Sequence, residues 1–198
     1  MPQLWVIAGP NGAGKTTVVS IRLRARIPII NTDDIAKNMQ PNGQISSATL
    51  IKAGRLSLAQ QQTLLAERKS FGLEATFAGK REIILMQAAK QLGYKVNLVY
   101  IGIRSASVSC ARVLARVSNG GHSVPFSDIH RRYPRSLENL KTGLALADRA
   151  YILDNSGKRR RLLLSIDKRG IKFAAQYDKL PEWSKEIIYS RISSQITS

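Results

Sequence analysis

Apolar and polar positions follow two rhythms that alternate along the chain. Short runs rich in β-branched and aliphatic residues predict strands at 3–8, 27–31, 70–77, 94–103 and 149–155. Between them, apolar residues at helical spacing predict helices at 16–26, 46–69, 81–93 and 105–118, then a helix broken near Pro134. Strands that alternate with helices predict an α/β fold, in which a parallel sheet flanked by helices binds its ligand at the carboxyl ends of the strands.

The C-terminal part of the chain has a different pattern. RLLLSID (161–167) and IKFAAQY (171–177) predict a β-hairpin, and a short helix is expected after Pro181. No internal repeat or low-complexity linker separates this part from the rest. We therefore expect a kinase-like core over residues 1–156, with the hairpin and helix of residues 157–198 packed on the same domain.

A glycine-rich stretch, GPNGAGKT (9–16), joins the first predicted strand to the first predicted helix. It matches the P-loop pattern GxxxxGK[ST], in which glycines let backbone N–H groups converge on phosphate oxygens. Lys15 is expected to reach the β- and γ-phosphates, and the Thr16 hydroxyl to hold Mg²⁺. The predicted nucleotide-binding residues are Gly9, Pro10, Asn11, Gly12, Ala13, Gly14, Lys15, Thr16 and Thr17.

Two aspartates follow the second predicted strand in the motif NTDD, at the edge of the sheet beside the P-loop. Small-molecule kinases place here the carboxylate that accepts a proton from the acceptor hydroxyl. An aspartate at this position can instead cap the following helix, and we assign catalysis to Asp33 and the cap to Asp34. The sequence lacks the NKxD element with which GTPases bind guanine, so ATP is the expected donor.

The composition adds a large positive charge, with 31 Lys and Arg against 13 Asp and Glu, a formal net charge of +18. No acidic residue precedes Asp33 or lies between Glu82 and Asp128, so the basic character is spread over several regions. Any one basic stretch can be a solvated surface. For the whole chain, a phosphorylated substrate or a nucleic acid is the expected partner.

Hydrophobic residues make up 43% of the chain, which is enough for a core. The single cysteine, Cys110, excludes an internal disulfide and a cysteine metal cluster, which suits a reducing compartment. The N-terminal sequence MPQLWVIAGP lacks a signal-peptide pattern, and no run approaches the ~18 apolar residues of a membrane helix. These features predict a soluble, cytoplasmic protein without a membrane segment.

Arginines are concentrated in the second half of the chain. Arg112 and Arg116 lie four residues apart on one predicted helix and share a face, where they would neutralise a transferring phosphoryl group as catalytic residues. A glycine-rich loop follows that could close as a lid, and its His122 is assigned a substrate contact. Arg131 and Arg132 on the next helix are candidates for binding the phosphates of the substrate. For each arginine the alternative is an exposed solubilising charge, and for the histidine a structural hydrogen bond.

These motifs together resemble the zeta toxins, P-loop kinases of bacterial toxin–antitoxin systems. The resemblance rests on VIAGPNGAGKTT (6–17), INTDDIA (30–36), AGRLSL (53–58), SFGLEATFAG (70–79), RVLARVSNGGHSVP (112–125), IHRRYPRSLENL (129–140) and YILDNS (151–156). It implies transfer of the ATP γ-phosphate to a hydroxyl of the amino sugar in UDP-N-acetylglucosamine. It also implies that Asp33 is the general base and that Glu74 and the neighbouring Thr76 lie at the substrate site.

This chain departs from the long zeta toxins at two points. They carry a phosphate-contacting arginine near the position of His122, and EGT where this chain has EAT (74–76). Both differences fall at the acceptor site, so the resemblance bears more directly on phosphotransfer than on the sugar nucleotide. If the protein is toxic, a separate antitoxin protein is expected as its partner.

Two other functions stay open. A kinase of nucleic-acid ends would use the same P-loop and aspartate, and would account for the net charge and for KRRR (158–161). Only 6% of the chain is aromatic, however, and surfaces that bind single strands use several aromatic side chains. A binding module regulated by nucleotide is the third candidate, but it would have no use for a base at the acceptor position.

Overall fold

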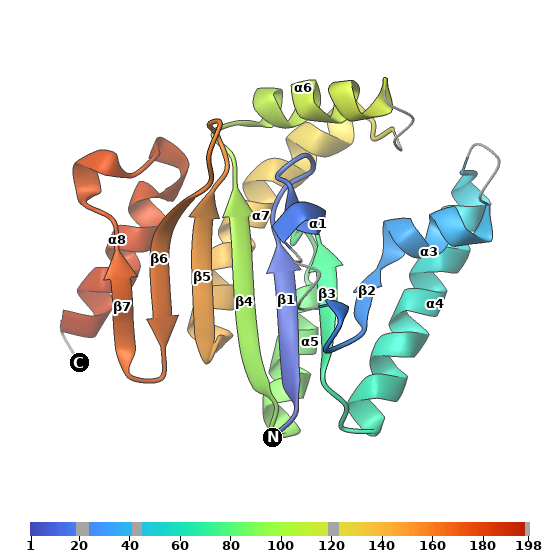
Figure 1. Cartoon of the computed structure of the whole chain (residues 1–198), viewed down its shortest axis with the longest axis horizontal. Helices are drawn as coiled ribbons and strands as arrows, with labels where there is room; N and C mark the ends of the chain where they lie inside the picture. Colours follow the sequence, from blue (N-terminus) through green and yellow to red (C-terminus); the bar gives the residue numbers. More distant parts are fainter. Residues whose placement is uncertain (19–23, 41–44, 119–122, 197–198) are drawn as a thin grey trace.

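The computed structural model describes residues 1–18, 24–40, 45–118 and 123–196 of the chain. Its centre is a seven-stranded sheet with the order β2-β3-β1-β4-β5-β6-β7 (Figure 1). The first five strands are parallel, and β6 and β7 are antiparallel additions at one edge. The strands are β1 (Gln3–Ala8), β2 (Ile29–Asn31), β3 (Phe71–Ala75), β4 (Lys95–Gly102), β5 (Arg149–Asp154), β6 (Arg161–Asp167) and β7 (Gly170–Ala174). The predicted α/β fold with a C-terminal hairpin is therefore confirmed.

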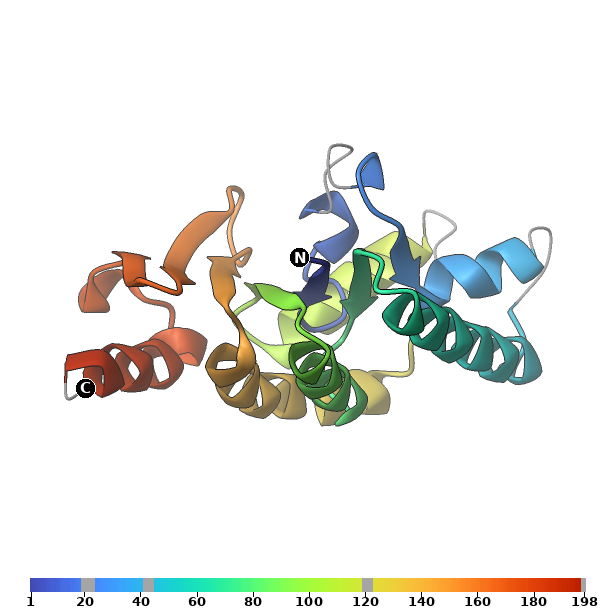
Figure 2. The ribbon, with the colours of Figure 1, turned by 90° about the horizontal axis from the view of Figure 1, so that it is seen from below.

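Four helices lie in a row along one face of this sheet, as Figure 2 shows from below. They are α4 (Ser47–Ala66), α5 (Arg81–Gln91), α7 (Phe126–Leu146) and α8 (Glu182–Ile196). Three further helices are α1 (Lys15–Val18), α3 (Thr32–Met39) and α6 (Ala106–Val117), and a short 3-10 helix η1 spans Tyr177–Lys179. Residues 19–23 of the first predicted helix lie outside the described part of the chain. None of the described helices combines the length and hydrophobicity needed to cross a membrane.

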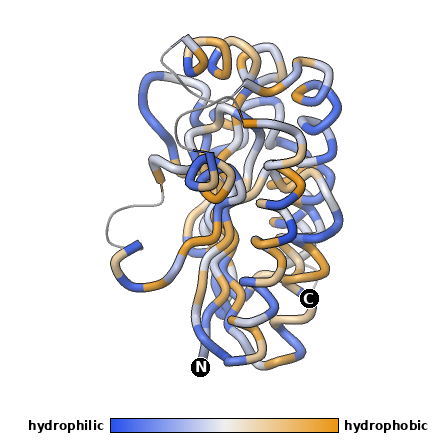
Figure 3. The backbone as a smooth tube through the Cα atoms, turned by 90° about the vertical axis from the view of Figure 1, so that its right-hand side faces the viewer, coloured by the Kyte–Doolittle hydropathy of each residue, from blue (hydrophilic) through white to orange (hydrophobic). Residues whose placement is uncertain are grey.

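The main hydrophobic core fills the space between the sheet and the row of helices. Fully buried side chains from the strands, such as Leu4, Phe71 and Tyr100, pack there with Met86 and Leu140 from the helices. The tube in Figure 3 shows the hydrophobic residues concentrated along the central strands. The alternating buried positions of β5 face this core, whereas β4 is buried along nearly its whole length. The burial of β4 on both faces agrees with the apolar, β-branched run that predicted a strand at 94–103.

The strand order fixes where a ligand can bind. The chain leaves β1 toward the β2 edge, returns through β3, and then crosses to β4 on the other side of β1. In open parallel sheets a crevice forms at the carboxyl ends of the strands where the order reverses in this way. Here that point lies beyond the end of β1, so the fold positions the glycine-rich loop at the crevice.

The expected break near Pro134 is wrong, because α7 runs without interruption from Phe126 to Leu146. A proline inside a helix removes one backbone hydrogen bond at a cost of about 3 kcal/mol. Here Pro134 and His130, whose carbonyl loses its partner, are both exposed, so water can hydrate that carbonyl. The buried face of the helix, which includes Ser136 and Leu140, packs on the core and keeps the helix continuous.

The helix after Pro181 is longer than the short helix expected, because α8 spans 15 residues. Its Ile187 and Ile188 are buried in the main core. Trp183 packs on the end of β4, where a Cβ added at Gly102 would lie 2.3 Å from the indole ring. This contact fixes α8 against the same end of the sheet that carries the glycine-rich loop.

Candidate active site

The glycine-rich loop connects β1 to α1, as predicted. Gly9, Gly12 and Gly14 all adopt positive φ angles of 144°, 70° and 83°. A Cβ at Gly9 would lie 2.2 Å from the carbonyl oxygen of Ile101, and a Cβ at Gly14 would lie 2.8 Å from Nδ2 of Asn155. Side chains are therefore excluded both by backbone strain and by close neighbours. The loop follows a path that only glycine allows, as a phosphate-binding loop requires.

Lys15 lies folded over this loop. Its Nζ donates hydrogen bonds to the carbonyl oxygens of Gly9 at 2.9 Å and Pro10 at 3.1 Å. Burial lowers the pKa of Lys15 to about 8, although the nearby carboxylates of Glu74 and Asp33 act to raise it. A desolvated ammonium group of this kind gains strongly from a new anionic partner. The geometry thus holds a positive charge ready for phosphate oxygens.

Two distant segments hold the glycine-rich loop in place. The Ser109 hydroxyl on α6 donates to the carbonyl oxygen of Asn11. Asn155 Nδ2, from the segment that follows β5, donates to the carbonyl oxygen of Ala13 at 2.9 Å. Sequence reasoning missed both contacts, because residues 98 and 142 positions apart give no periodic signal. YILDNS (151–156) was identified only as one of the motifs of the family resemblance. In the structure its Asn155 holds the glycine-rich loop through Ala13.

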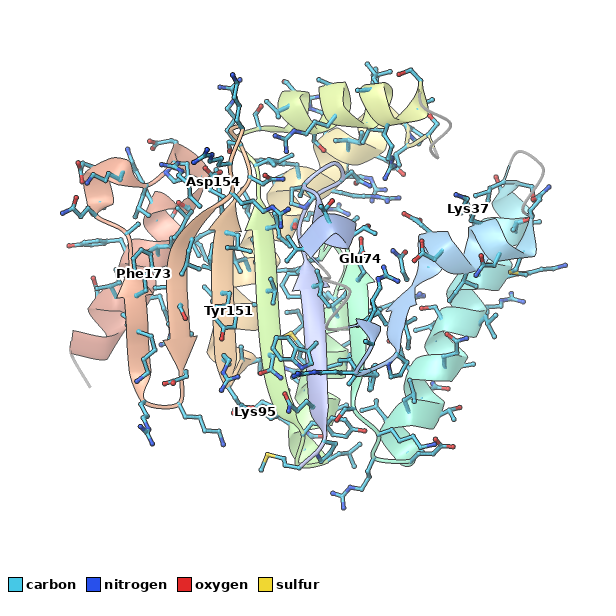
Figure 4. All side chains as sticks on the ribbon, viewed as in Figure 1. Lys37, Glu74, Lys95, Tyr151, Asp154 and Phe173 are labelled. Atoms are coloured by element: carbon cyan, nitrogen blue, oxygen red, sulfur yellow. The ribbon has the colours of Figure 1, made fainter. Side chains whose placement is uncertain are left out.

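A buried carboxylate, Asp154, directly precedes Asn155 at the end of β5. Asp154 is only 2% exposed and accepts hydrogen bonds from Ser156, from Trp183 Nε1 at 3.3 Å and from Arg161 Nη2 at 3.0 Å. Burial raises the pKa of Asp154, but these hydrogen bonds outweigh it and hold the pKa below its usual value. Figure 4 shows Asp154 at the same edge of the sheet as Glu74. Arg161 therefore forms an ion pair with a buried carboxylate and is not only part of an exposed basic run.

The aspartate pair lies at the start of α3, beside the glycine-rich loop. The assignment of Asp34 as the helix cap is wrong: the side chain of Asn31 is the N-cap and accepts from the backbone N–H of Asp33 at 2.9 Å and of Asp34 at 3.5 Å. An asparagine caps as well as an aspartate, and it stands one residue before the helix. The Asp34 carboxylate instead lies 3.7 Å from Arg24 Nη2. Asp33 is exposed and lines the cleft.

Glu74 is the second-last residue of β3 and faces the start of α1. Its Oε1 accepts a 2.8 Å hydrogen bond from the Thr16 hydroxyl. Its Oε2 is buried and has no hydrogen-bond donor among the described residues, with Arg24 Nη2 at 4.0 Å. Hydroxyl and carboxylate oxygens are the ligands that Mg²⁺ prefers, and Mg²⁺ is bound in phosphate sites by one or two such groups. The two side chains therefore fit a magnesium ion beside the phosphates of a nucleotide.

The turn after β3 forms one wall of the site and is held by α7. Phe77 is fully buried with a φ of 61°, a left-handed conformation that is rare for a bulky residue. Asn139 Nδ2 donates to the carbonyl oxygens of Phe77 at 2.9 Å and Gly79 at 2.8 Å, and Ser136 Oγ donates to that of Thr76 at 2.7 Å. These contacts fix the segment that leads from Thr76, which lines the cleft, into α5.

The predicted arginines separate into two groups. Arg112 and Arg116 on α6, and Arg132 on α7, line the cleft. Arg131 does not line it and donates to Asp128 Oδ1 at 2.7 Å, while Arg132 bonds the other oxygen of the same carboxylate at 2.7 Å. Asp128 thus orients Arg132 toward the cleft. A role of Arg131 in substrate binding stays a prediction.

A single cleft of about 590 Å³ connects these groups. Its walls are the glycine-rich loop, the start of α3, one face of α4, the end of β3, the start of α5 and the arginines of α6 and α7. His122 lies outside the described residues. The predicted site residues that line the cleft are Asn11, Gly12, Gly14, Lys15, Thr16, Thr17, Asp33, Glu74, Thr76, Arg112, Arg116 and Arg132. Gly9, Pro10 and Ala13 belong to the same loop but lie behind this surface.

Comparison with known proteins agrees with this architecture. Residues 4–139 match the protein family described as AAA domain. The chain is also 35% identical over 138 residues to an uncharacterized protein of Haemophilus influenzae, in a match that covers 66% of this chain and 97% of that protein.

Solved structures share the fold at lower identity. A chain of the AvrRxo1-ORF1:-ORF2 crystal structure with ATP has a TM-score of 0.73 at 17% identity, over 98% of this chain and 64% of that chain. A chain of the PezAT chromosomal toxin-antitoxin system of Streptococcus pneumoniae has a TM-score of 0.64 at 18% identity, over 96% and 78%. A chain of the Pnkp1/Rnl/Hen1 RNA repair complex has a TM-score of 0.56 at 17% identity, over 71% and 45%. The chain spans only 60–64% of the AvrRxo1 chains it matches.

The low pKa of Lys15 predicts a pH-dependent affinity for nucleotide. Because its pKa is about 8 in the empty loop, Lys15 must take up a proton to bind phosphate above that pH. The affinity for ATP should therefore be constant below about pH 8 and fall by up to about tenfold per pH unit above it. Titration calorimetry from about pH 7 to about pH 10 measures this. A Lys15→Arg variant, whose charge does not titrate in this range, should lose the trend. A flat profile for the wild-type protein would contradict the lowered pKa of Lys15.

Proposed function

The chain belongs to the AAA domain family and has the phosphotransferase fold of P-loop kinases, and we propose that it transfers the γ-phosphate of ATP to a hydroxyl of a small, anionic acceptor. The leading candidate for the acceptor is a UDP-sugar such as UDP-N-acetylglucosamine. One observation carries this proposal. Lys15 and Asp33 line the same cleft of about 590 Å³.

The donor half of the cleft contains groups suited to the phosphates of ATP. The glycine-rich loop offers its backbone, and Lys15 exchanges its two carbonyl partners for β- and γ-phosphate oxygens. Arg112 and Arg116, one turn apart on α6, neutralise the charge that builds up on the transferring group. Thr16 and Glu74 would hold Mg²⁺, which supplies charge neutralisation and orientation of the phosphates when bound.

Asp33 is the proposed general base. It is exposed to the cleft, and the Asn31 cap fixes its backbone at the first turn of α3. As the acceptor oxygen attacks the γ-phosphorus, its proton passes to the Asp33 carboxylate. A new P–O bond forms to the acceptor while the bond to the β-γ bridging oxygen breaks, and ADP leaves. Asp34 instead forms an ion pair with Arg24 beside the start of α3.

The identity of the acceptor rests on the resemblance to zeta toxins and on the chemistry of the cleft. Arg132, oriented by Asp128, offers a guanidinium to an anionic acceptor, and Arg81 also lines the cleft. One solved structure with this fold comes from a toxin–antitoxin system, and another is a complex with a second protein. A separate protein that neutralises this chain is therefore part of the proposal.

The second candidate is a kinase of nucleic-acid ends. The net charge of +18 favours it, and a chain of an RNA repair complex shares the fold. The lining of the cleft speaks against it, because no described residue that lines the cleft is aromatic. Proteins that hold unpaired bases stack them on aromatic side chains. The cleft suits a compact polar acceptor better than a stacked strand.

The two aspartates should respond differently to removal of their charge. Asp33→Asn keeps the size of the side chain and removes the proton acceptor, so phosphotransfer should fall by about 10² to 10⁴ while ATP still binds. Asp34→Asn, the matched control, should lower the rate less than about tenfold, since it loses only an exposed ion pair. Transfer from labelled ATP to UDP-N-acetylglucosamine measures both. A larger loss for Asp34→Asn would show that the base is assigned to the wrong residue.

The acceptor classes can be separated by salt. We expect labelled ATP to phosphorylate a UDP-sugar with little change between about 50 and about 200 mM salt, whereas a polymer held through six or so phosphates would lose about 10³ in affinity. Reversing the exposed charges of Lys158, Arg159 and Arg160 should leave sugar phosphorylation intact, with Arg161 kept because it pairs with Asp154. Labelling of RNA or DNA ends with a steep salt dependence, and of no UDP-sugar, would contradict the proposal.

A further inference from the structure

Helix α4 buries polar side chains on the face that it turns toward the cleft. Its buried residues are Ala53, Ser57 and Gln61, and the last two also line the cleft. Ser57 is 3% and Gln61 9% exposed, and Gln61 Nε2 donates to Ser57 Oγ at 3.1 Å. A helix packed against a sheet normally buries an apolar stripe and leaves its polar residues to solvent. This polar stripe therefore has no explanation in the stability of the core.

Gly54 extends the same stripe, one turn before Ser57. It lines the cleft, and a Cβ added to it would meet no atom within 4 Å. Glycine inside a helix weakens that helix relative to alanine, and no backbone angle or close contact requires glycine here. The absence of a side chain at Gly54 leaves open volume in the cleft, on the face of α4 that carries Ser57 and Gln61.

Glu82, in the first turn of α5, also lines the cleft. Its Oε2 is buried and has no hydrogen-bond partner among the described residues. Burial raises the pKa of this carboxyl group. The segment that leads to it is fixed by α7 through Asn139, so the position of Glu82 is set before any ligand binds. A buried carboxylate oxygen without a donor is costly unless a ligand supplies one.

We propose that Gly54, Ser57, Gln61 and Glu82 form a subsite that binds the hydroxyl groups of the acceptor's sugar or polyol. This assignment rests on the proposed function, since it divides the same cleft into a donor half and an acceptor half. A sugar hydroxyl both donates and accepts hydrogen bonds. Glu82 Oε2 can accept from one hydroxyl, while the Ser57 hydroxyl and the Gln61 amide can bond others. The open volume at Gly54 admits the ring.

The side chains that line the cleft also exclude some ligands from this subsite. Arg112 and Arg116 on α6 and Arg132 on α7 supply positive charge from other elements around the cleft, and Arg81 precedes Glu82 in α5, but the stripe on α4 contains no charged residue. No described lining residue is aromatic, so a base has no ring on which to stack. The part of the acceptor held by α4 is therefore neutral and hydroxylated, and the anionic part lies toward the arginines.

A side chain placed at Gly54 tests the subsite directly. Gly54→Leu should fill the open volume and raise the dissociation constant for UDP-N-acetylglucosamine, measured with a non-hydrolysable ATP analogue bound, by about tenfold or more. Its affinity for the analogue should change less than about twofold, because Gly54 lies outside the donor half. Ala59→Leu adds the same side chain on the exposed face of α4 and should alter neither affinity. Thermal unfolding of each variant verifies that it is folded.

A second variant tests the polar contacts. Glu82→Gln keeps the size of the side chain and replaces an acceptor oxygen by a donor, so it should raise the KM for the sugar about tenfold with a smaller change in kcat and none in the KM for ATP. If the wild-type protein phosphorylates UDP-N-acetylglucosamine and both variants do so with unchanged KM, the subsite is wrong and the proposed function stands. If the wild-type protein binds the ATP analogue but not the UDP-sugar, both the subsite and the proposed acceptor fall.

Discussion

The close approach of β1 to β4 at Gly9 is the constraint on which the rest of the site depends. Because a Cβ there would lie 2.2 Å from the carbonyl oxygen of Ile101, only glycine fits at the position where the chain leaves β1. From this point the loop turns back over the end of the sheet and brings Lys15 onto the carbonyl oxygens of Gly9 and Pro10. The position of every other catalytic candidate is set by an element that packs on this loop or faces it.

Positive and negative side chains around this loop come from different elements of the fold. Lys15 and the arginines of α6 surround the donor half, whereas Asp33 and Glu74 stand at the ends of β2 and β3. The half-buried Lys15 and the buried oxygen of Glu74 add little to the stability of the protein on their own and gain when a phosphate and a metal ion supply further partners. The buried Glu74 Oε2 is the clearest sign of this, because it has no hydrogen-bond donor among the described residues.

Local signals in the sequence were enough for the fold and for the centre of the site. A strand, three glycines and a lysine in GPNGAGKT predicted the loop, and the buried β4 was recognised from an apolar run. One error arose where two local signals compete, because Asn31 takes the cap expected of Asp34, and another arose where tertiary packing of α7 overrides the local effect of Pro134. The bonds from Asn155 and Ser109 to the loop, and the polar face of α4, depend on tertiary contacts and have no local pattern.

The most direct test of this account is the contribution of Lys15 to nucleotide binding. Calorimetric titration of ATP into the wild-type protein and into Lys15→Ala, at a pH near 7 where the lysine is charged, isolates that contribution. The account predicts saturable binding by the wild-type protein and an affinity at least about tenfold lower for Lys15→Ala, since a charge aimed at the phosphates is lost. Equal affinities in two equally stable proteins would contradict the assignment of the glycine-rich loop as the phosphate-binding site.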